Sequence, residues 1–500
     1  MMVSVAFDCF EKVNSIILQV SHINNNILQM ALFRICVNTS RRLYKCQVSR
    51  SASKYVALRN FSSSFSKLRD ELDTIEKNIL LRKHTNNVSI IKSLLAELSE
   101  HPGNIDALKK LELEVGKLPN RTHERLIAYG EKPCEIQRNQ LPLPKVDDFS
   151  TVCKDFNYIR TDHLGNFNGH KSYYLLGDLA NLEQSLIRFT VEYLKRNKFL
   201  LMSVPDILPG SFINGCGMQT EGDRTQIYKI ETEECLSGTS EMALAGLFSG
   251  TVLDEKKLPL KVAAVSRCYR AETSGLNEEK GIYRVHQFTK VEMFSVCSKN
   301  QSEAVLESFK NTEVSLYEKL NFRFRVLDMP PIELGASAFQ KYDIEVWMSG
   351  RQMWGEISSC SNCTDYQAKR LNIKYRTTAG NLEYAHTVNG TAAAMPRLLI
   401  SLLESNKIEN GTISVPESLK EILKDRNGWE QKADSLEFYW FDGDCAPNSV
   451  INAIIDEGNT VDENSTAGAA GKRIEDFVAA LYLKYNFVGM RLEGERIIMI

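Results

Sequence analysis

The stretch that most constrains the fold of this chain runs from residue 261 to residue 296. Residues 261–270 are rich in Val, Ala and Tyr, and residues 283–296 alternate polar and apolar side chains with a period of two. Between these runs lies a polar loop, about residues 273–281, that holds Ser, Gly, Asn and three charges. The pattern predicts a β-hairpin with a long tip.

Charged side chains occur inside the strand-like parts of this hairpin: Arg270, Glu272, His286, Lys290 and Glu292. Charges along a strand commonly mark a face that water covers. The alternative is a sheet floor that presents fixed charges to a polyanionic ligand, because a guanidinium group binds phosphate and carboxylate oxygens in pairs. The hairpin by itself leaves both interpretations open.

The rest of the chain indicates an α+β fold. Amphipathic helices are expected over 177–197 and 303–320, and strands over 199–204, 322–327, 344–348 and 355–359. These segments lack the regular βαβ rhythm of a parallel sheet, which favours an antiparallel sheet flanked by helices. The chain contains neither a P-loop nor a GxGxxG sequence, so the two usual phosphate-binding loops are excluded.

Composition predicts five segments in the 500 residues. They are a leader over 1–62, a short helical domain over 63–120 with apolar residues at coiled-coil spacing, a proline-punctuated linker over 121–145, a main domain over 146–423, and an extension of unknown role over 424–500. The net charge of −2 gives no global sign of nucleic-acid binding, so an RNA partner would need local basic patches.

The leader is rich in Arg and Ser and poor in acid, with no Asp or Glu between Met30 and Arg69. This composition is typical of a mitochondrial transit peptide, and a basic tail that binds RNA is the alternative. Its apolar run over residues 16–20 is far shorter than the roughly 20 residues that a membrane span needs. We therefore expect no transmembrane segment.

Four blocks in chain order resemble the class II aminoacyl-tRNA synthetases, in their seryl form. Residues 269–272, Tyr-Arg-Ala-Glu, with residues 283–288, Tyr-Arg-Val-His-Gln-Phe, resemble motif 2, and residues 386–397 with Glu404 resemble motif 3. Residues 238–241, Gly-Thr-Ser-Glu, resemble the seryl TxE block, and residues 354–362 match a further seryl pattern. The resemblance covers about residues 118–423 and is closest to the animal mitochondrial seryl-tRNA synthetases.

The resemblance implies a class II catalytic domain preceded by a short tRNA-binding helical arm. A helix, a strand and then Pro205 resemble motif 1, which implies a homodimer. The sequence departs from the usual pattern at three positions: Ser240 stands where Ala is common, Lys280 where Arg is usual, and Lys369 precedes Arg370 where two arginines are common.

The implied activity is ATP-dependent charging of mitochondrial tRNA(Ser) with L-serine through seryl-adenylate, in the mitochondrial matrix. Such a reaction needs positioning and fixed cations, including Mg²⁺, and no nucleophilic side chain. The alternative is a catalytically inactive relative kept as an RNA- or partner-binding protein. An inactive copy would be expected to have lost Arg270, Glu272, Glu292 or Arg397, and all four are present.

The resemblance also implies the site residues. The catalytic residues are Arg270, Glu356 and Arg397. The serine-binding residues are Thr239, Glu241, Arg270, Glu292, Asn389 and Thr391. The ATP-binding residues are Arg270, Glu272, Val285, Phe288, Glu356, Ile357, Ser358, Ser359 and Arg397. Mg²⁺ would be held through ATP by the hard oxygen ligands of Glu356 and Ser359.

Overall fold

The computed structural model describes residues 68–142, 146, 148–161, 171–222, 225–230, 233–272, 281–406, 408–409, 412–413, 415–424, 490–493 and 496–499. The chain divides into one unit of residues 1–431 and a second of residues 432–500. In the second unit the described residues form a two-stranded sheet of β18 (Met490–Glu493) and β19 (Arg496–Met499). The predicted leader and most of the predicted extension lie outside the described residues.

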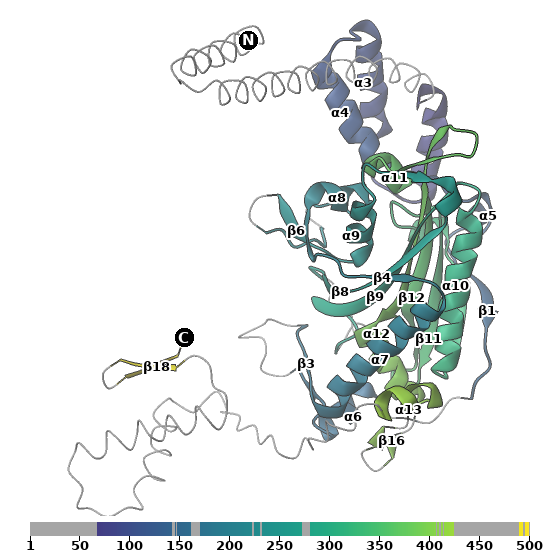
Figure 1. Ribbon diagram of the computed structural model, residues 1–500. Helices are drawn as coiled ribbons and strands as arrows, with labels where there is room; N and C mark the ends of the chain where they lie inside the picture. The colour runs from purple at the N-terminus through teal and green to yellow at the C-terminus, as the bar shows by residue number, and fades with distance from the viewer. Residues whose placement is uncertain are drawn as a thin grey trace, which may run out of the picture. The chain divides into compact units, whose positions relative to one another are not determined.

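An eight-stranded sheet forms the centre of the first unit, in the order β1-β10-β11-β12-β15-β9-β8-β4 (Figure 1). Its strands are β1 (Cys134–Arg138), β4 (Leu200–Met202), β8 (Leu260–Tyr269), β9 (Gln287–Cys297), β10 (Phe324–Asp328), β11 (Gln340–Met348), β12 (Met353–Thr364) and β15 (His386–Ala394). Only β4 and β8 pair in parallel in this sheet, and all its other neighbours are antiparallel. The predicted α+β fold around an antiparallel sheet is confirmed.

The predicted hairpin is confirmed as β8 and β9, which pair from Leu260 opposite Val296 to Tyr269 opposite Gln287. The strands end earlier than the sequence pattern suggests. Arg270 lies just beyond β8, where its backbone N–H still donates to the carbonyl oxygen of His286 at 2.8 Å. The pairing of β8 and β9 ends at Tyr269 opposite Gln287. The charges beyond these strand ends therefore lie at the open end of the hairpin, which we call its mouth.

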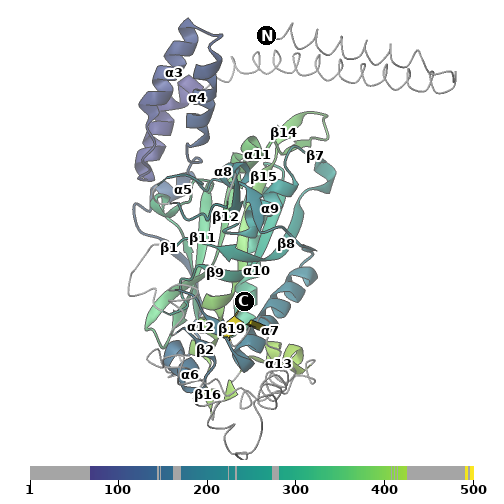
Figure 2. The same cartoon turned by 90° about the vertical axis from the view of Figure 1, so that its left-hand side faces the viewer.

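Helices cover both faces of the sheet and build two apolar clusters (Figures 1 and 2). One cluster contains α7 (Gly177–Arg196), α10 (Ser302–Lys319) and α12 (Met395–Ser405), and the other contains α8 (Gly210–Gly215), α9 (Ser240–Leu247) and α11 (Tyr366–Leu371). Side chains alternate along β9 between the two clusters, so Val291 and Met293 face the first and Phe294 faces the second. Lys290 and Glu292 share the face of Phe294 because the period of a strand is two.

The apolar residues at coiled-coil spacing that predict the short helical domain form one cluster in the structure. They belong to a helix over residues 68–81, α3 (Val88–Glu100) and α4 (Ile105–Gly116). Asn87 and Asn104 cap α3 and α4, because each side chain accepts from a backbone N–H of the first turn. The cluster lies at the end of the sheet that carries α11 (Figure 2).

The predicted linker over residues 121–145 is not a plain linker. It contains α5 (Glu124–Ile127) and β1, which pairs with β10 at the edge of the sheet. One residue of β1 is half-buried and the other four are exposed, so the strand lacks the polar–apolar alternation by which strands are recognised. The central sheet therefore begins before the predicted boundary at residue 146.

The remaining described elements are short. They are α6 (Phe149–Asp155), β2 (Ile159–Arg160), β3 (Tyr174–Leu175), β5 (Ile207–Pro209), β6 (Glu234–Leu236), β7 (Val252–Asp254), η2 (Glu255–Lys257), η4 (Pro331–Glu333), β13 (Lys374–Arg376), β14 (Leu382–Tyr384), β16 (Ile408–Glu409), β17 (Thr412–Ile413) and α13 (Glu417–Lys424). Among the residues that the structure describes, no helix has both the length and the apolar character to cross a membrane.

Candidate active site

Thr239 lies directly before α9, and hydrogen bonds of its hydroxyl group connect that helix to β9. Its hydroxyl oxygen caps α9 by accepting from the backbone N–H of Glu241 at 3.3 Å. The same oxygen accepts from Lys290 Nζ at 2.7 Å and lies 3.3 Å from Glu292 Oε2, to which the hydroxyl donates. The TxE block and the charged face of β9, separate in the sequence, therefore form one polar group.

Lys290 and Glu292 form an ion pair in which both residues are at most 5% exposed. Burial raises the pKa of Glu292 to about 7, and Lys290 beside it limits this rise by favouring the carboxylate. Glu241 acts in the same direction as burial, because two nearby carboxylates repel each other. The pair thus holds a carboxyl group that titrates near neutral pH.

Glu241 faces the same polar group from α9. Its Oε1 accepts from Gln367 Nε2 at 2.6 Å, and Asn389 also hydrogen-bonds to it. Burial raises the pKa of Glu241, while these hydrogen bonds and the positive charges of Lys290 and Arg270 oppose the rise. The carboxylate therefore depends on its neighbours to stay ionised.

Arg270 is half-buried at the mouth of the hairpin. Its Nε donates to the carbonyl oxygen of Gly238 at 3.3 Å, and its guanidinium lies 5.3 Å from the ring centroid of Phe288. No carboxylate of the described residues forms an ion pair with Arg270. The guanidinium is thus held at one edge by the backbone, and its terminal nitrogens are available to an anionic ligand.

Arg397 is a second arginine of the candidate site and lies in the first turn of α12. Its Nη1 donates to Glu356 Oε2 at 3.2 Å and to the Glu356 carbonyl oxygen at 2.9 Å, and its Nε donates to the carbonyl oxygen of Tyr283 at 3.2 Å. The guanidinium also lies 4.5 Å from the Tyr283 ring centroid. Three hydrogen bonds, to acceptors of Glu356 and Tyr283, therefore fix the orientation of the Arg397 guanidinium.

A second ion pair, Lys341 with Asp343 at 2.8 Å, lies on β11, where Asp343 is directly opposite Ser359 of β12. Burial acts to raise the pKa of Glu356, but Lys341 and Arg397 outweigh it and hold that pKa below its ordinary value. Burial raises the pKa of Asp343. Of the two carboxyl groups, Glu356 is therefore the one that stays ionised.

The side chains of four predicted ATP-binding residues contact other groups of the protein. Glu272 Oε2 accepts from Arg284 Nη1 at 3.2 Å at the mouth of the hairpin. Val285 and Ile357 are buried in the apolar cluster around α10, and the Ser358 hydroxyl donates to the carbonyl oxygen of Thr391 at 2.6 Å. The side chains of Val285, Ile357 and Ser358 are thus engaged within the protein, so only their backbone atoms can meet a ligand.

The predicted catalytic residues converge on one side of the sheet. The charge of Arg270 acts to lower the pKa values of Glu241, Glu292 and Glu356, so its guanidinium lies near enough to interact with all three carboxylates. Thr391 is paired with Glu292 in the register of β15 and β9, which places it at the same position of the floor. In the described part of the chain, no group of three His, Cys, Asp or Glu residues is arranged to hold a metal ion.

Comparisons with known proteins show the family of this chain. The family described as tRNA synthetase class II core domain (G, H, P, S and T) matches residues 227–406. The mitochondrial serine–tRNA ligase of Mus musculus is 40% identical over 333 residues, which are 65% of this chain and 64% of the relative. The serine–tRNA ligase of Borrelia garinii subsp. bavariensis is 36% identical over 377 residues, which are 73% of this chain and 86% of the relative. This chain belongs to the serine–tRNA ligase family.

A solved member of the serine–tRNA ligase family has the same fold. The seryl-tRNA synthetase of Pyrococcus horikoshii, in a crystal structure with ATP, aligns with a TM-score of 0.60 and 29% identity and covers 74% of this chain and 90% of that chain. Against the mouse mitochondrial ligase, by contrast, the chain spans only 64% of the length of the relative.

Sequence reasoning left three contributors to this site unassigned. Lys290 was visible as a charge on the hairpin, but its pairing with Glu292 and Thr239 depends on the fold. Lys341 and Gln367 carry no motif, and each acts on a predicted residue from another segment of the chain. The only available signal for Lys341 was a lysine two residues before an aspartate within a strand-like run.

Proposed function

We propose that this protein is an active mitochondrial serine–tRNA ligase. It would join L-serine to ATP as seryl-adenylate, with release of pyrophosphate, and then transfer the seryl group to tRNA(Ser). The observation that carries this proposal is Arg270, held by the Gly238 carbonyl and beside Phe288, close enough to interact with the Glu241, Glu292 and Glu356 carboxylates. A guanidinium at that point can bind the serine carboxylate and the α-phosphate together.

The polar group around Thr239 suits the serine end of the reaction. Glu241 and Glu292 supply negative charge for an ammonium group, and Asn389 and Thr391 lie on the strand that borders them. A pocket that pairs the substrate hydroxyl discriminates against alanine, because its own buried polar groups would be left unpaired. The proposed substrate is therefore serine.

The phosphate end of the reaction would lie between Arg270 and Arg397. The serine carboxylate oxygen attacks the α-phosphorus, the bond to the β-phosphate oxygen breaks, and pyrophosphate leaves with the electron pair. Both guanidinium groups stabilise the charge that spreads over the phosphate oxygens in this step. The ring of Phe288 beside Arg270 is suited to stack on adenine, and Glu272 to accept from its amino group.

The donor set around Ser359 fits a magnesium ion that is shared with phosphate. Glu356 keeps its carboxylate ionised, and carboxylate and hydroxyl oxygens are ligands that Mg²⁺ accepts. Mg²⁺ prefers sites of one or two carboxylates completed by substrate phosphates and water, which agrees with the lack of a protein-only metal cluster among the described residues. The ion would neutralise phosphate charge.

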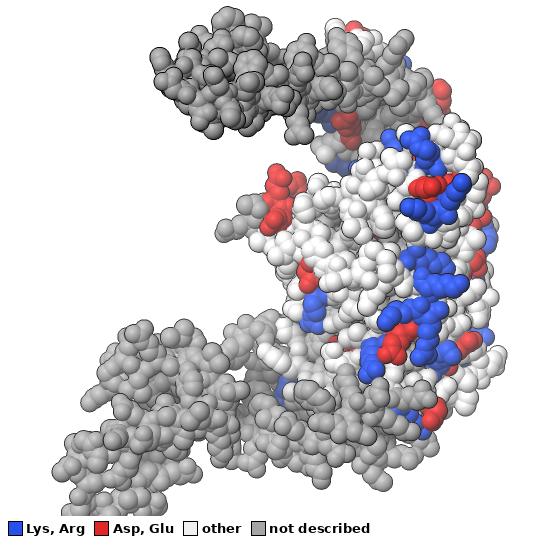
Figure 3. All heavy atoms as spheres, viewed as in Figure 1, with Lys and Arg blue, Asp and Glu red and all other residues white. Residues whose placement is uncertain are grey.

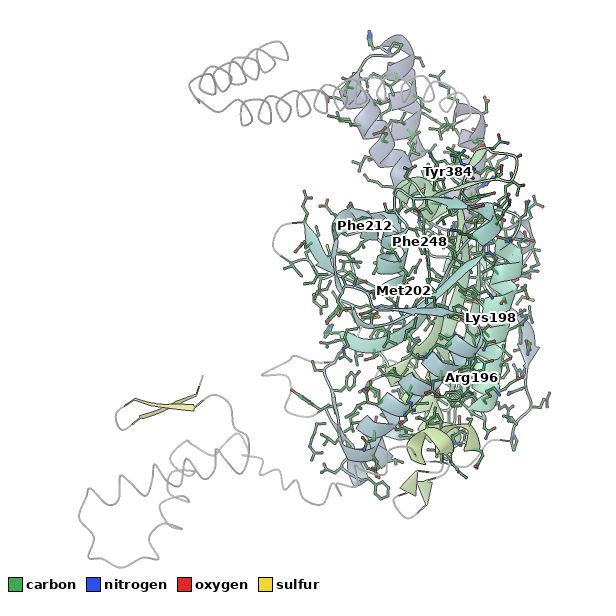
Figure 4. The ribbon with its side chains drawn as sticks, in the orientation of Figure 1. Arg196, Lys198, Met202, Phe212, Phe248 and Tyr384 are labelled. Carbon is green, nitrogen blue, oxygen red and sulfur yellow. The ribbon has the colours of Figure 1, made fainter. Side chains whose placement is uncertain are left out.

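We further propose a homodimer that forms through the β4 edge of the sheet. Leu200, Leu201 and Ile207 are 61%, 43% and 50% exposed, which is unusual for large apolar residues at the edge of a sheet. The side chains of Met202 and Phe212, on the same side of the molecule in Figure 4, are only partly buried against the core. Figure 3 shows that the centre of this face is mostly uncharged and that Lys and Arg form a column beside it. A second copy of the chain would cover the uncharged area.

Serine-dependent ATP–pyrophosphate exchange with the full-length chain tests the proposed activity. We expect exchange with serine, little exchange with alanine, and aminoacylation of mitochondrial tRNA(Ser). The similarity to mitochondrial relatives supports a mitochondrial location, and the matrix is the compartment proposed from the leader composition. A chain that binds tRNA but supports no exchange would instead favour the inactive, RNA-binding alternative.

A further inference from the structure

Gln367, at the second position of α11, connects two elements of the proposed serine pocket. It is completely buried, and its Nε2 donates to Glu241 Oε1 at 2.6 Å. Its Oε1 accepts from the hydroxyl of Thr387 at 2.7 Å. Because the amide oxygen is engaged by a hydroxyl donor, the amide nitrogen must face the carboxylate. Gln367 thus fixes one oxygen of Glu241 by a hydrogen bond that favours the ionised carboxylate.

Arg370, one turn further along α11, contacts the helical arm. Its Nη2 donates to the carbonyl oxygen of Gly116 at 3.0 Å and to that of Leu118 at 3.2 Å, and its Nε donates to Gly116 at 3.3 Å. Gly116 is the last residue of α4, whose terminal carbonyl groups have no partner within the helix. The guanidinium also lies 3.3 Å from the ring centroid of Tyr366, which holds it against α11.

The arm is anchored a second time immediately before α11. Asn120 Nδ2 donates to the carbonyl oxygen of Cys363 at 2.8 Å and to the Thr364 hydroxyl at 3.1 Å. Arg82, directly after the first helix of the arm, donates to the carbonyl oxygen of Asn120 and to that of Ala338, the latter at 2.8 Å. Both ends of α11 are therefore tied to the root of the arm, and its buried face is tied to Glu241.

We propose that α11 links the helical arm to the serine pocket, with Gln367 as a positioning residue for Glu241 and Arg370 as the residue that ties α11 to the arm. The proposal rests on the proposed function, in which Glu241 receives the serine ammonium group. A displacement of the arm would move α11, and Glu241 would lose the donor that orients its carboxylate.

The charge state of Glu241 gives this link a measurable signature. Glu241 is faced by Lys290 and Glu292 from β9, by Asn389 from β15, by Gln367 from α11, by Arg270, and by the thiols of Cys216 and Cys363. Burial raises its pKa and the bond from Gln367 lowers it. Without Gln367 the pKa rises further, so more of the carboxyl group is protonated at a given pH and less can bind an ammonium ion.

Steady-state ATP–pyrophosphate exchange with the full-length chain tests the link. Gln367→Met keeps the size of the side chain and removes both hydrogen bonds, and Arg370→Ala removes the tie to the arm. The matched control is Lys369→Ala on the same helix, because Lys369 is exposed and pairs only with Asp365 among the described residues. The readouts are the KM for serine, the KM for ATP and the melting temperature of each variant.

We expect Gln367→Met to raise the KM for serine about 10-fold or more, because a hydrogen bond to a charged group is lost. Its KM for ATP should stay within about 2-fold, and its serine defect should grow as the pH falls from about 8 to about 6, because a raised pKa is crossed earlier on acidification. Arg370→Ala should raise the KM for serine about 3-fold. The effect is smaller than for Gln367→Met because the hydrogen bond would be only partly lost, and each 1.4 kcal/mol corresponds to a factor of ten. Lys369→Ala should match the parent protein.

The outcomes separate the two proposals. Exchange absent from the parent protein would remove the proposed function and this link with it. An active parent with an unchanged serine KM in Gln367→Met would overturn the positioning role alone. A serine KM unchanged by Arg370→Ala would overturn the tie to the arm. If Gln367→Met does not fold, the serine KM of Arg370→Ala decides the proposal, since Arg370 lies outside the buried core of α11.

Discussion

Lys290 and Glu292, two residues apart on β9, form a buried ion pair beneath the hydroxyl of Thr239. Removal of one member of a buried pair leaves the other charge without compensation, which costs about 3–5 kcal/mol. We therefore expect Lys290→Met to lower the free energy of unfolding by that amount in urea denaturation. The matched control is Lys299→Ala, which removes an exposed pair with Glu383 and should cost at most about 1 kcal/mol. Equal losses in both variants would contradict the assignment of a buried pair.

The pKa of Glu292, raised to about 7 by burial, predicts the pH dependence of serine binding. Above this pH the carboxyl group is ionised and attracts the serine ammonium, and below it protonation removes that charge. The kcat/KM for serine in pyrophosphate exchange should therefore fall as the pH is lowered through about 7. Glu292→Gln cannot titrate, so its profile should lose this step. A step that persists in Glu292→Gln would assign the titration to another group.

The proximity of Arg270 to the Glu241 and Glu356 carboxylates predicts a large catalytic defect on its removal. We expect Arg270→Ala to lower kcat/KM for serine-dependent exchange by about 100-fold or more, because a preorganised cation on the reacting phosphate is lost. Arg270→Lys should recover only part of the activity, since an ammonium group cannot bind two oxygens as a fork. Arg376→Ala provides the control, because Arg376 is exposed and donates to Gly380 in a separate small sheet. Near-normal exchange in Arg270→Ala would contradict the proposed site.

The polar–apolar alternation of the hairpin and the four local sequence blocks were sufficient to predict the centre of this fold. The hairpin of β8 and β9 was predictable because polar and apolar residue types alternate in its second strand, whereas β1 was missed because an edge strand with four exposed residues has no such pattern. The charges of the site were visible for the same local reason. Their pairing was not, since Glu241 and Gln367 are 126 residues apart and meet only when α9 and α11 pack together.

The sequence also did not predict which face of the sheet each side chain occupies. Ile357, Ser358 and Ser359 are neighbours in one block, but Ile357 lies in the apolar cluster around α10, and the hydroxyl of Ser358 is bound to the carbonyl of Thr391. Ser359 instead lies opposite Asp343 in the register of β11 and β12. A register irregularity between Ile344 and Glu345 changes the alternation here, and a bulge of this kind has no clear mark in the sequence.

The exposed apolar residues of β4 predict the effect of charge on assembly. Leu200→Glu places a carboxylate among the exposed apolar residues of β4, so we expect the variant to be monomeric in sedimentation velocity while the parent protein is a dimer. The control is Leu113→Glu, because Leu113 is equally exposed, at 61%, but lies on α4 of the arm. A parent protein that sediments as a monomer, or a dimer that tolerates Leu200→Glu, would contradict the proposed interface.

Glu313 on α10 determines which residue β15 can carry at position 390. A Cβ atom added to Gly390 would lie 2.7 Å from Glu313 Oε1, and Glu313 is fully buried, so its carboxyl group has little room to move. We expect Gly390→Ala to cost about 1–3 kcal/mol of unfolding free energy, as overpacking does, and to raise the KM for serine because Asn389 and Thr391 flank this position. In Glu313→Ala the same substitution should cost at least about 1 kcal/mol less, since residues in direct contact are not additive. A double-mutant cycle by urea denaturation measures this coupling, and strictly additive costs would show that another neighbour, such as Cys360 at 3.1 Å, excludes the methyl group.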